Sequence, residues 1–254
     1  MPSLTEHAEA LRALLRPGEP LVLANVWDAA SARVVADAAA PALATSSAAV
    51  AEARGYADRD IMPADIAFDA VTSITRAVPD LPVSADLEAG YRLPPDDLVG
   101  RLLAAGAVGC NIEDTDHHGP GTLVDAAAHA ERLHAIRRAG DRAAVPIVLN
   151  ARVDVFSHAG TTPPADVLPA ALDRCRRYLN AGADTVYPIG LTDEAAIATL
   201  VAATDGMLNI WVRPDGPSLR RLRELGVARV SVATGLFRAA MRAVRNEAAR
   251  IYGD

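Results

Sequence analysis

Short apolar runs alternate with longer segments whose apolar residues recur at helical spacing, and this alternation extends along the whole chain. The eight short runs that predict strands are Leu21–Val26, Ala42–Thr45, Pro82–Leu87, Gly109–Glu113, Pro146–Ala151, Thr185–Pro188, Met207–Trp211 and Arg229–Ala233. The longer segments predict a helix after each strand and one before the first: Ala29–Ala38, Ala64–Val78, Asp96–Ala105, Asp125–Ala139, Ala165–Ala181, Asp193–Ala203, Ser218–Leu225, Thr234–Ile251 and, at the start, Glu6–Leu15. This strict alternation favours a closed, parallel (β/α)8 TIM-type barrel over an open sheet.

The length and composition fit one domain. The 254 residues are 51% hydrophobic and no linker divides them, so we expect a single catalytic domain over residues 1–254. A net charge of −7 with scattered arginines gives no broad basic surface, which argues against a nucleic-acid partner.

Expectations about location follow from features that the sequence lacks. The first residues have neither the basic start nor the apolar run of a signal peptide, and no stretch of about 18 uncharged apolar residues could span a bilayer. Cys110 and Cys175 fit neither a metal-ligand spacing nor a disulfide framework, and we expect both to be structural core residues. The sequence therefore predicts a soluble protein of the reducing cytoplasm, without a membrane partner.

Acidic residues gather where the third and fourth predicted strands end. Alternation along the third strand puts Asp86 and Glu88 on one side, and Glu113 can face them from the next strand. Active sites of (β/α)8 barrels lie at these C-terminal strand ends. Three carboxylates there repel one another unless a cation neutralises them or some of them are protonated. Oxygen ligands favour Mg²⁺, with Mn²⁺ as an alternative. The competing interpretation is that these acids cap helices or pair with arginines at the rim.

Two further features could bind an anion. Arg152 ends the fifth predicted strand, where its guanidinium could hold a carboxylate or phosphonate by two hydrogen bonds, or pair with Glu113 or Asp154. The turn Ser46–Ala48 could offer backbone N–H groups to an anion, or be an ordinary turn of small residues.

In the residues at these strand ends, the chain resembles the isocitrate lyase and phosphoenolpyruvate mutase superfamily, and the resemblance covers nearly its whole length. The resemblance rests on short runs in a fixed order: Asn25–Ala29, Thr45–Ala48, Gly55–Asp58, Ala85–Tyr91, Asn111–Asp114 and Ala151–Asp154. It implies a barrel that binds Mg²⁺ directly through Asp86, with Glu88 and Glu113 acting mainly through metal-bound water.

The resemblance also implies how a substrate is held. Arg152 would grip the anionic end of a 2-oxo carboxylate, and Asp58 would lie on a mobile loop near the reacting centre. The other substrate-binding residues that the resemblance implies are Trp27, Ser46, Ser47, Ala48 and Asn209. A metal-bound 2-oxo acid can carry negative charge as an enolate, so a C–C or P–C bond at its third carbon can be made or broken.

The stretch after the fourth predicted strand departs from the superfamily. Its lyases carry a catalytic cysteine there and its mutases a basic, asparagine-containing loop, whereas residues 115–121 offer His117 and His118 instead. One of these histidines could shuttle a proton, or both could be exposed without a role. His158, after the fifth strand, is a further candidate. Ile189 stands where the lyases place a glutamate, which argues against a tricarboxylic substrate.

We therefore predict a Mg²⁺-dependent lyase or decarboxylase that cleaves a C–C bond in a small 2-oxo or derived 2-hydroxy acid. The alternatives are a phosphoenolpyruvate mutase or phosphonopyruvate hydrolase acting on a P–C bond, and a barrel that binds ligands without turnover. The resemblance implies a homodimer or homotetramer, and leaves open whether the C-terminal helix is exchanged between subunits.

Overall fold

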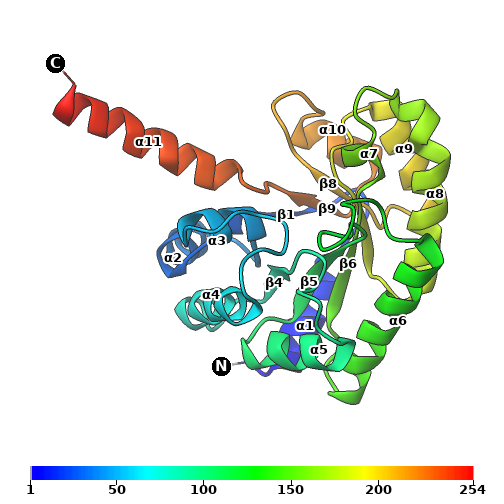
Figure 1. Cartoon of the computed structure of the whole chain (residues 1–254), viewed down its shortest axis with the longest axis horizontal. Helices are drawn as coiled ribbons and strands as arrows, with labels where there is room; N and C mark the ends of the chain where they lie inside the picture. The colour runs from blue at the N-terminus through cyan, green and yellow to red at the C-terminus, as the bar shows by residue number, and fades with distance from the viewer. Residues whose placement is uncertain (1, 254) are drawn as a thin grey trace.

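The computed structural model describes residues 2–253 and consists of short parallel strands surrounded by helices (Figure 1). The strands are β1 (Leu21–Leu23), β2 (Asn25–Val26), β3 (Leu43–Thr45), β4 (Val83–Asp86), β5 (Gly109–Glu113), β6 (Val148–Val153), β7 (Thr185–Pro188), β8 (Asn209–Trp211) and β9 (Arg229–Ser231). The helices are α1 (Leu4–Ala13), α2 (Ala29–Asp37), α3 (Ser47–Ala53), α4 (Ala64–Ala77), α5 (Pro95–Ala104), α6 (Ala126–Arg142), α7 (Val155–His158), α8 (Pro164–Asn180), α9 (Glu194–Ala203), α10 (Leu219–Leu225) and α11 (Gly235–Tyr252).

The strands follow the order of a (β/α)8 barrel, which confirms the predicted fold class. Their backbone hydrogen bonds form two parallel sheets, β2-β3-β4-β5-β6-β7 and β1-β9-β8. The first predicted strand is split at Ala24, so that β1 pairs with β9 while β2 pairs with β3. A single bridge between Val186 and Leu208 links β7 to the strand that follows it. The strand-to-strand ladder is therefore interrupted at these two junctions.

Two helices were not predicted, and both follow strands that reach the polar end of the barrel. α3 has seven residues, and its N-cap residue Ser46 accepts a hydrogen bond on its hydroxyl from the Ala49 N–H at 3.4 Å. α7 has four residues and begins directly after Asp154. α7 is too short to show an apolar stripe, and four of the seven residues of α3 are alanines, so neither segment shows the contrast of apolar and polar positions that predicts a helix.

The barrel has an apolar outer wall and a polar interior. On β5, Cys110 and Ile112 are fully buried in the hydrophobic core, whereas Asn111 and Glu113 alternate with them and meet polar partners. The prediction that Cys110 and Cys175 are buried is confirmed, and both thiols are free.

The leading helix α1 lies at the N-terminal ends of β5 and β6. Arg12 pairs with Asp184 at 2.8 Å and donates to the Ile147 carbonyl at 2.8 Å. A Cβ added at Gly109 would come within 2.9 Å of the Leu11 side chain, so this glycine permits the close approach of the helix. α1 therefore covers the end of the barrel opposite the acidic strand ends.

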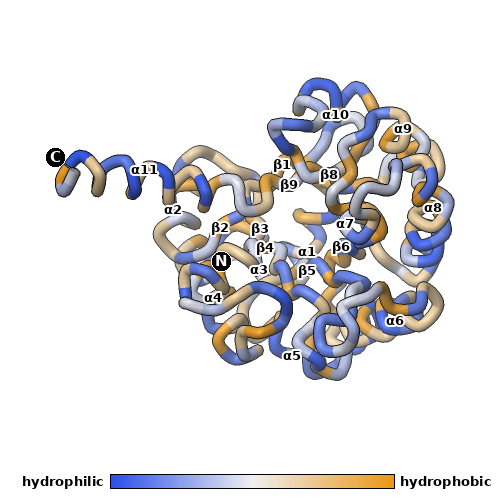
Figure 2. Tube along the Cα trace, turned by 45° about the horizontal axis from the view of Figure 1, so that its top comes forward, coloured by the Kyte–Doolittle hydropathy of each residue, from blue (hydrophilic) through white to orange (hydrophobic). Residues whose placement is uncertain are grey.

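The C-terminal helix α11 extends away from the barrel (Figure 1). Phe237 near its start is buried against Trp27, with the two rings edge to face at 5.2 Å, whereas Met241, Val244 and Ile251 are exposed. Figure 2 shows hydrophobic and hydrophilic colours alternating along this helix. No helix within residues 2–253 combines the length and the apolar character needed to cross a bilayer.

Candidate active site

A cavity of about 610 Å³ opens where β4, β5 and β6 end. Its walls come from the strand ends and from the loops that follow them. The lining residues are Asp58, Arg59, Glu88, Glu113, Thr115, His117, Gly121, Arg152, Asp154, Ser157, His158 and Gly160. The structure thus brings Asp58, Glu88, Glu113, His117, His158 and Arg152 together, whereas Asp86 is not part of this lining.

Asp86 is the last residue of β4 and is half-buried beside the start of α3. Its Oδ2 accepts hydrogen bonds from the Ser47 N–H at 3.1 Å and the Ser47 hydroxyl at 2.8 Å. Its Oδ1 lies 3.4 Å from Asn111 Nδ2, and its backbone N–H donates to the Thr45 hydroxyl. Both carboxylate oxygens are therefore oriented by neighbouring strands before any ligand binds.

Glu88 reaches the site by a different route from the one predicted. β4 ends at Asp86, and Glu88 has a left-handed φ of 51°, so strand alternation does not place it beside Asp86. The carboxylate instead accepts hydrogen bonds from the Asp60 backbone N–H and, at 3.3 Å, from the Tyr91 hydroxyl. Burial raises the pKa of Glu88 to about 8, and the nearby carboxylates of Asp58, Asp60 and Asp86 add to the rise.

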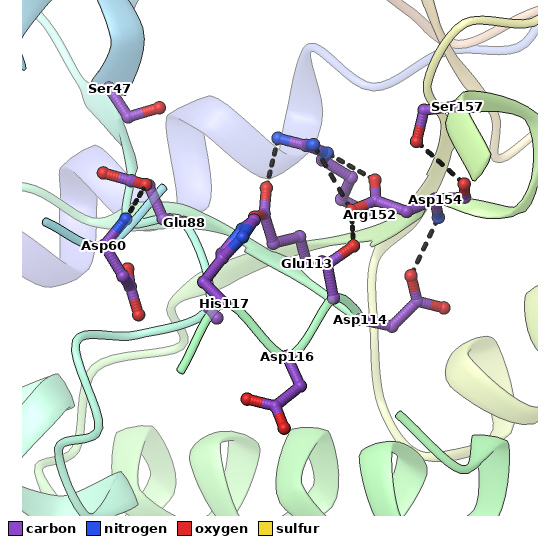
Figure 3. A network of polar contacts seen from close by, with 12 residues as sticks. Ser47, Asp60, Glu88, Glu113, Asp114, Asp116, His117, Arg152, Asp154 and Ser157 are labelled. Carbon is purple, nitrogen blue, oxygen red and sulfur yellow. Dashed lines mark hydrogen bonds and ion pairs between the residues drawn. The ribbon is translucent and has the colours of Figure 1, made fainter. Parts of the chain in front are cut away.

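Glu113 lies between two basic side chains (Figure 3). Its Oε1 bonds His117 Nε2 and its Oε2 pairs with Arg152 Nη1. Burial raises the pKa of Glu113, and the two basic neighbours offset part of that rise. The hydrogen bond to Glu113 in turn raises the pKa of His117. Glu113 therefore couples the loop after β5 to the end of β6.

Arg152 is held by Asp154 as well as by Glu113. Its Nε donates to Asp154 Oδ1 at 2.6 Å and its Nη2 to Asp154 Oδ2 at 3.3 Å. Asp154 also accepts a hydrogen bond from the Thr115 hydroxyl. The expected pairing with both acids is thus present, and Arg152 still lines the cavity with a fifth of its side chain exposed.

The structure separates the three candidate histidines. His117 lines the main cavity. His118 points into a neighbouring cavity of about 180 Å³, where its Nε2 lies 3.3 Å from Asp60 Oδ2. His158 also lines the main cavity, and its Nε2 is 3.0 Å from the Thr115 hydroxyl. His117 is therefore the histidine that both faces the cavity and contacts a predicted metal-site acid.

Five residues predicted to bind substrate lie away from the lining described above. Asn209 is fully buried inside the barrel, and its Nδ2 donates a hydrogen bond to the Ser231 hydroxyl at 3.1 Å. Trp27 packs on Phe237, and Ser46 caps α3. Ala48 lies within the first turn of that helix, and Ser47 uses its N–H and hydroxyl on Asp86. The turn after β3 therefore orients a carboxylate of the protein itself in this structure.

Sequence reasoning missed the contributions of Asp60 and Tyr91 to the site, and it considered Asp154 only as a possible partner of Arg152. One structural signal marks the first two, because the residues with left-handed φ include Arg59, Asp60, Glu88 and Tyr91. This conformation is uncommon outside glycine and often accompanies functional sites. Tyr91 and Asp154 lie within the runs that carry the family resemblance, so proximity to those runs could have indicated them.

The acids fit a hydrated cation better than an ion bound directly by all three. No group of three His, Cys, Asp or Glu side chains within residues 2–253 is arranged to hold a metal together. Glu88, however, is buried among other carboxylates without a basic side chain bonded to it in the described chain, and an added cation would favour its ionised form. Oxygen donors of this kind suit Mg²⁺ or Mn²⁺, which retain several water ligands.

A family profile described as phosphoenolpyruvate phosphomutase matches residues 11–252. The chain belongs to this family. The phosphoenolpyruvate phosphomutase of Streptomyces hygroscopicus is 30% identical over 258 residues, which cover 96% of this chain and 80% of that protein. An inferred phosphonomutase from Burkholderia cenocepacia J2315 superposes with a TM-score of 0.91 at 42% identity, covering 99% of this chain and 100% of the other.

The family also contains lyases. The structure of 2,3-dimethylmalate lyase, a member of the PEP mutase/isocitrate lyase superfamily, superposes with a TM-score of 0.85 at 26% identity, covering 100% of this chain and 90% of the other. The predicted membership of the isocitrate lyase and phosphoenolpyruvate mutase superfamily is therefore confirmed, and the relatives of the chain include a phosphomutase and a lyase.

Proposed function

We propose that the chain is a Mg²⁺-dependent enzyme that cleaves a C–C bond in a small 2-oxo acid or a derived 2-hydroxy acid. The position of His117 carries this proposal. His117 lines the cavity and bonds Glu113, on a loop of residues 115–123 that contains no lysine, arginine or cysteine. A histidine there can move a proton at the third carbon of the substrate, whereas the loop offers no fixed positive charge to a migrating phosphoryl group.

Asp86 would hold Mg²⁺, or Mn²⁺ in its place, with Glu88 and Glu113 interacting through water. When bound, the ion would stabilise the negative charge that develops on the 2-oxo group as the bond at the third carbon breaks. Ser47 and Asn111 fix the direction of the Asp86 carboxylate. The site is therefore organised around one well-oriented ligand.

Arg152 would bind the carboxylate of the substrate. Its planar guanidinium is oriented by Glu113 and Asp154 and faces the cavity, so little ordering is needed when an anion binds. Asp58, on the loop before α4, lies at the exposed edge of the same cavity, where it would close on the bound acid.

His117 would carry the proton to or from the third carbon. Its contact with Glu113 orients the ring, and its place in the lining puts it within reach of a ligand in the cavity. His118 faces the neighbouring cavity and would act on the site through Asp60, not by contact with the substrate.

Product analysis tests the proposal against both alternatives. Purified protein with Mg²⁺ is incubated with oxaloacetate and with 2,3-dimethylmalate, and products are followed by proton NMR. Phosphonopyruvate is followed in parallel by phosphorus NMR. We expect C–C cleavage that disappears in Asp86→Ala and persists in Asp80→Ala, which changes an exposed acid at the opposite end of β4. P–C turnover alone would establish the mutase or hydrolase alternative, and Mg²⁺ binding without any turnover would favour a binding protein.

We also propose that the chain forms a homodimer or homotetramer in the cytoplasm through α11. The side chains of Phe237, Met241, Val244, Ala248 and Ile251 recur at helical spacing, and most of this face is exposed. Packing of this stripe on a second copy would bury it. Light scattering should show an oligomer for the full chain and a smaller species for Val244→Glu; a monomeric wild type would contradict the proposal.

A further inference from the structure

Arg229 is a fully buried arginine in the interior of the barrel. It begins β9, between Leu21 on one neighbouring strand and Asn209 on the other, and none of its surface is exposed. Its Nη2 donates to Asn111 Oδ1 at 3.2 Å, and its Nε and Nη1 have no hydrogen-bond partner among residues 2–253. A buried guanidinium without a bonded carboxylate is unfavourable unless another group compensates its charge.

Asn111 connects this guanidinium to Asp86. Asn111 Oδ1 accepts hydrogen bonds from Arg229 and, at 2.7 Å, from Asn150 Nδ2. Two donors on the oxygen fix the orientation of the amide, so its Nδ2 faces Asp86 Oδ1 at 3.4 Å. Asn150 is fixed in turn by the Thr185 hydroxyl, which donates to Asn150 Oδ1 at 2.7 Å.

Opposite charges therefore occupy the two ends of one amide. Asp86 is bonded by Ser47 and Asn111, and no basic side chain of the described chain bonds it directly. Arg229, on the other side of Asn111, likewise has no bonded acid among those residues. Burial lowers the pKa of Arg229 only to about 10, so the guanidinium stays charged at neutral pH.

We propose that Arg229 is the internal counter-charge of Asp86. Its positive charge balances the Asp86 carboxylate when no metal is bound, and it lowers the affinity of the site for Mg²⁺. The inference rests on the proposed role of Asp86 as the metal ligand. Arg229 does not reach the cavity and is a positioning residue, acting through charge and through Asn111. We therefore expect bound Mg²⁺ to exchange readily with solvent, because the permanent positive charge of Arg229 lies behind Asp86 and repels the ion.

Calorimetric titration with Mg²⁺ alone, and with Mn²⁺ alone, tests this role in three proteins. Arg229→Met removes the charge at similar volume, and Arg229→Lys retains it. We expect Arg229→Met to bind Mg²⁺ about tenfold or more tightly than wild type, because the repulsion of a doubly charged ion is lost. The Mg²⁺ affinity of Arg229→Lys should stay within about threefold of the wild-type affinity, because lysine retains the positive charge. Addition of Mg²⁺ at a fixed concentration should raise the Tm of Arg229→Met by more than it raises the Tm of the wild type, because the variant binds the ion more tightly.

The outcomes separate this inference from the proposed function. Equal Mg²⁺ affinities in Arg229→Met and Arg229→Lys, or weaker binding in Arg229→Met, would overturn the role of Arg229 alone. Failure of the wild type to bind Mg²⁺ would overturn the metal site and this inference with it. Far-UV circular dichroism checks the fold of each variant. Arg229→Gln supplies the same uncharged comparison if Arg229→Met does not fold.

Discussion

Ser47 donates two hydrogen bonds to a single oxygen of Asp86, one from its backbone N–H and one from its hydroxyl. The serine begins α3 and the aspartate ends β4, so two consecutive βα units meet at this contact. Ser47 therefore helps to orient Asp86, the proposed metal ligand.

Ser47→Ala should weaken Mg²⁺ binding by about 10- to 100-fold, a usual loss when a group that orients a metal ligand is removed. The substitution deletes the hydroxyl donor and keeps the N–H. Calorimetry measures the change, with Ser73→Ala as the matched control, since the Ser73 hydroxyl is exposed and bonds only the Asp69 carbonyl within the described structure. An affinity equal to that of the control would show that Ser47 does not support the site.

His117→Gln should lower kcat by roughly 10²- to 10⁴-fold, because a positioned proton carrier contributes this much. His118→Gln should lower it by about tenfold at most, since His118 faces the neighbouring cavity and reaches the site only through Asp60. Steady-state kinetics on the substrate that the product analysis identifies provides the measurement. Equal losses of kcat in the two variants would show that the different positions of His117 and His118 do not correspond to different catalytic roles.

Arg152→Lys should reduce kcat/KM by roughly 10- to 100-fold while changing Tm little, because a point charge cannot reproduce the planar two-bond contact with a carboxylate. Arg142→Lys is the control, since Arg142 pairs with Asp96 on the surface. A large fall in Tm without a change in kcat/KM would instead assign Arg152 a purely structural part, as the partner of Glu113 and Asp154.

His129 should make the folded state sensitive to acid. It is buried against Tyr178, with ring centroids 4.9 Å apart, and burial lowers its pKa to about 3. The folded state therefore keeps His129 neutral, while the unfolded state takes up a proton as the pH falls below roughly 6.5. The contribution of His129 to stability is fully present above that pH and decreases down to the folded pKa.

Between pH 7 and pH 5, this linkage should remove about 2 kcal/mol of the free energy of unfolding. His129→Phe keeps the ring contact and removes the titrating group, so its urea midpoint should fall less over the same interval. His134→Gln, on the exposed side of the same helix, should behave like wild type. If the stability of His129→Phe depends on pH in the same way as that of the wild type, His129 is not the group that makes the folded state sensitive to acid.

The sequence by itself determined the alternation of strands and helices, the end of the barrel that carries the chemistry, and most of the charged residues found there. These features are local: apolar periodicity decides which segments become strands, and parallel strands place their C-terminal residues at one end. Asp86, Glu113 and Arg152 could be identified because each lies at such an end.

Only the tertiary structure decided the partners of those residues. The left-handed backbone at Glu88, the separation of His117 from His118, and the Ser47 donors on Asp86 each depend on loops folded against other strands. Asn209 shows the same limit, because its position on β8 follows from the pattern, whereas its contact with Ser231 depends on how the strands align around the barrel. Strand periodicity is a property of neighbouring residues, but hydrogen bonds and ion pairs across a barrel join residues far apart in sequence, and packing alone brings them together.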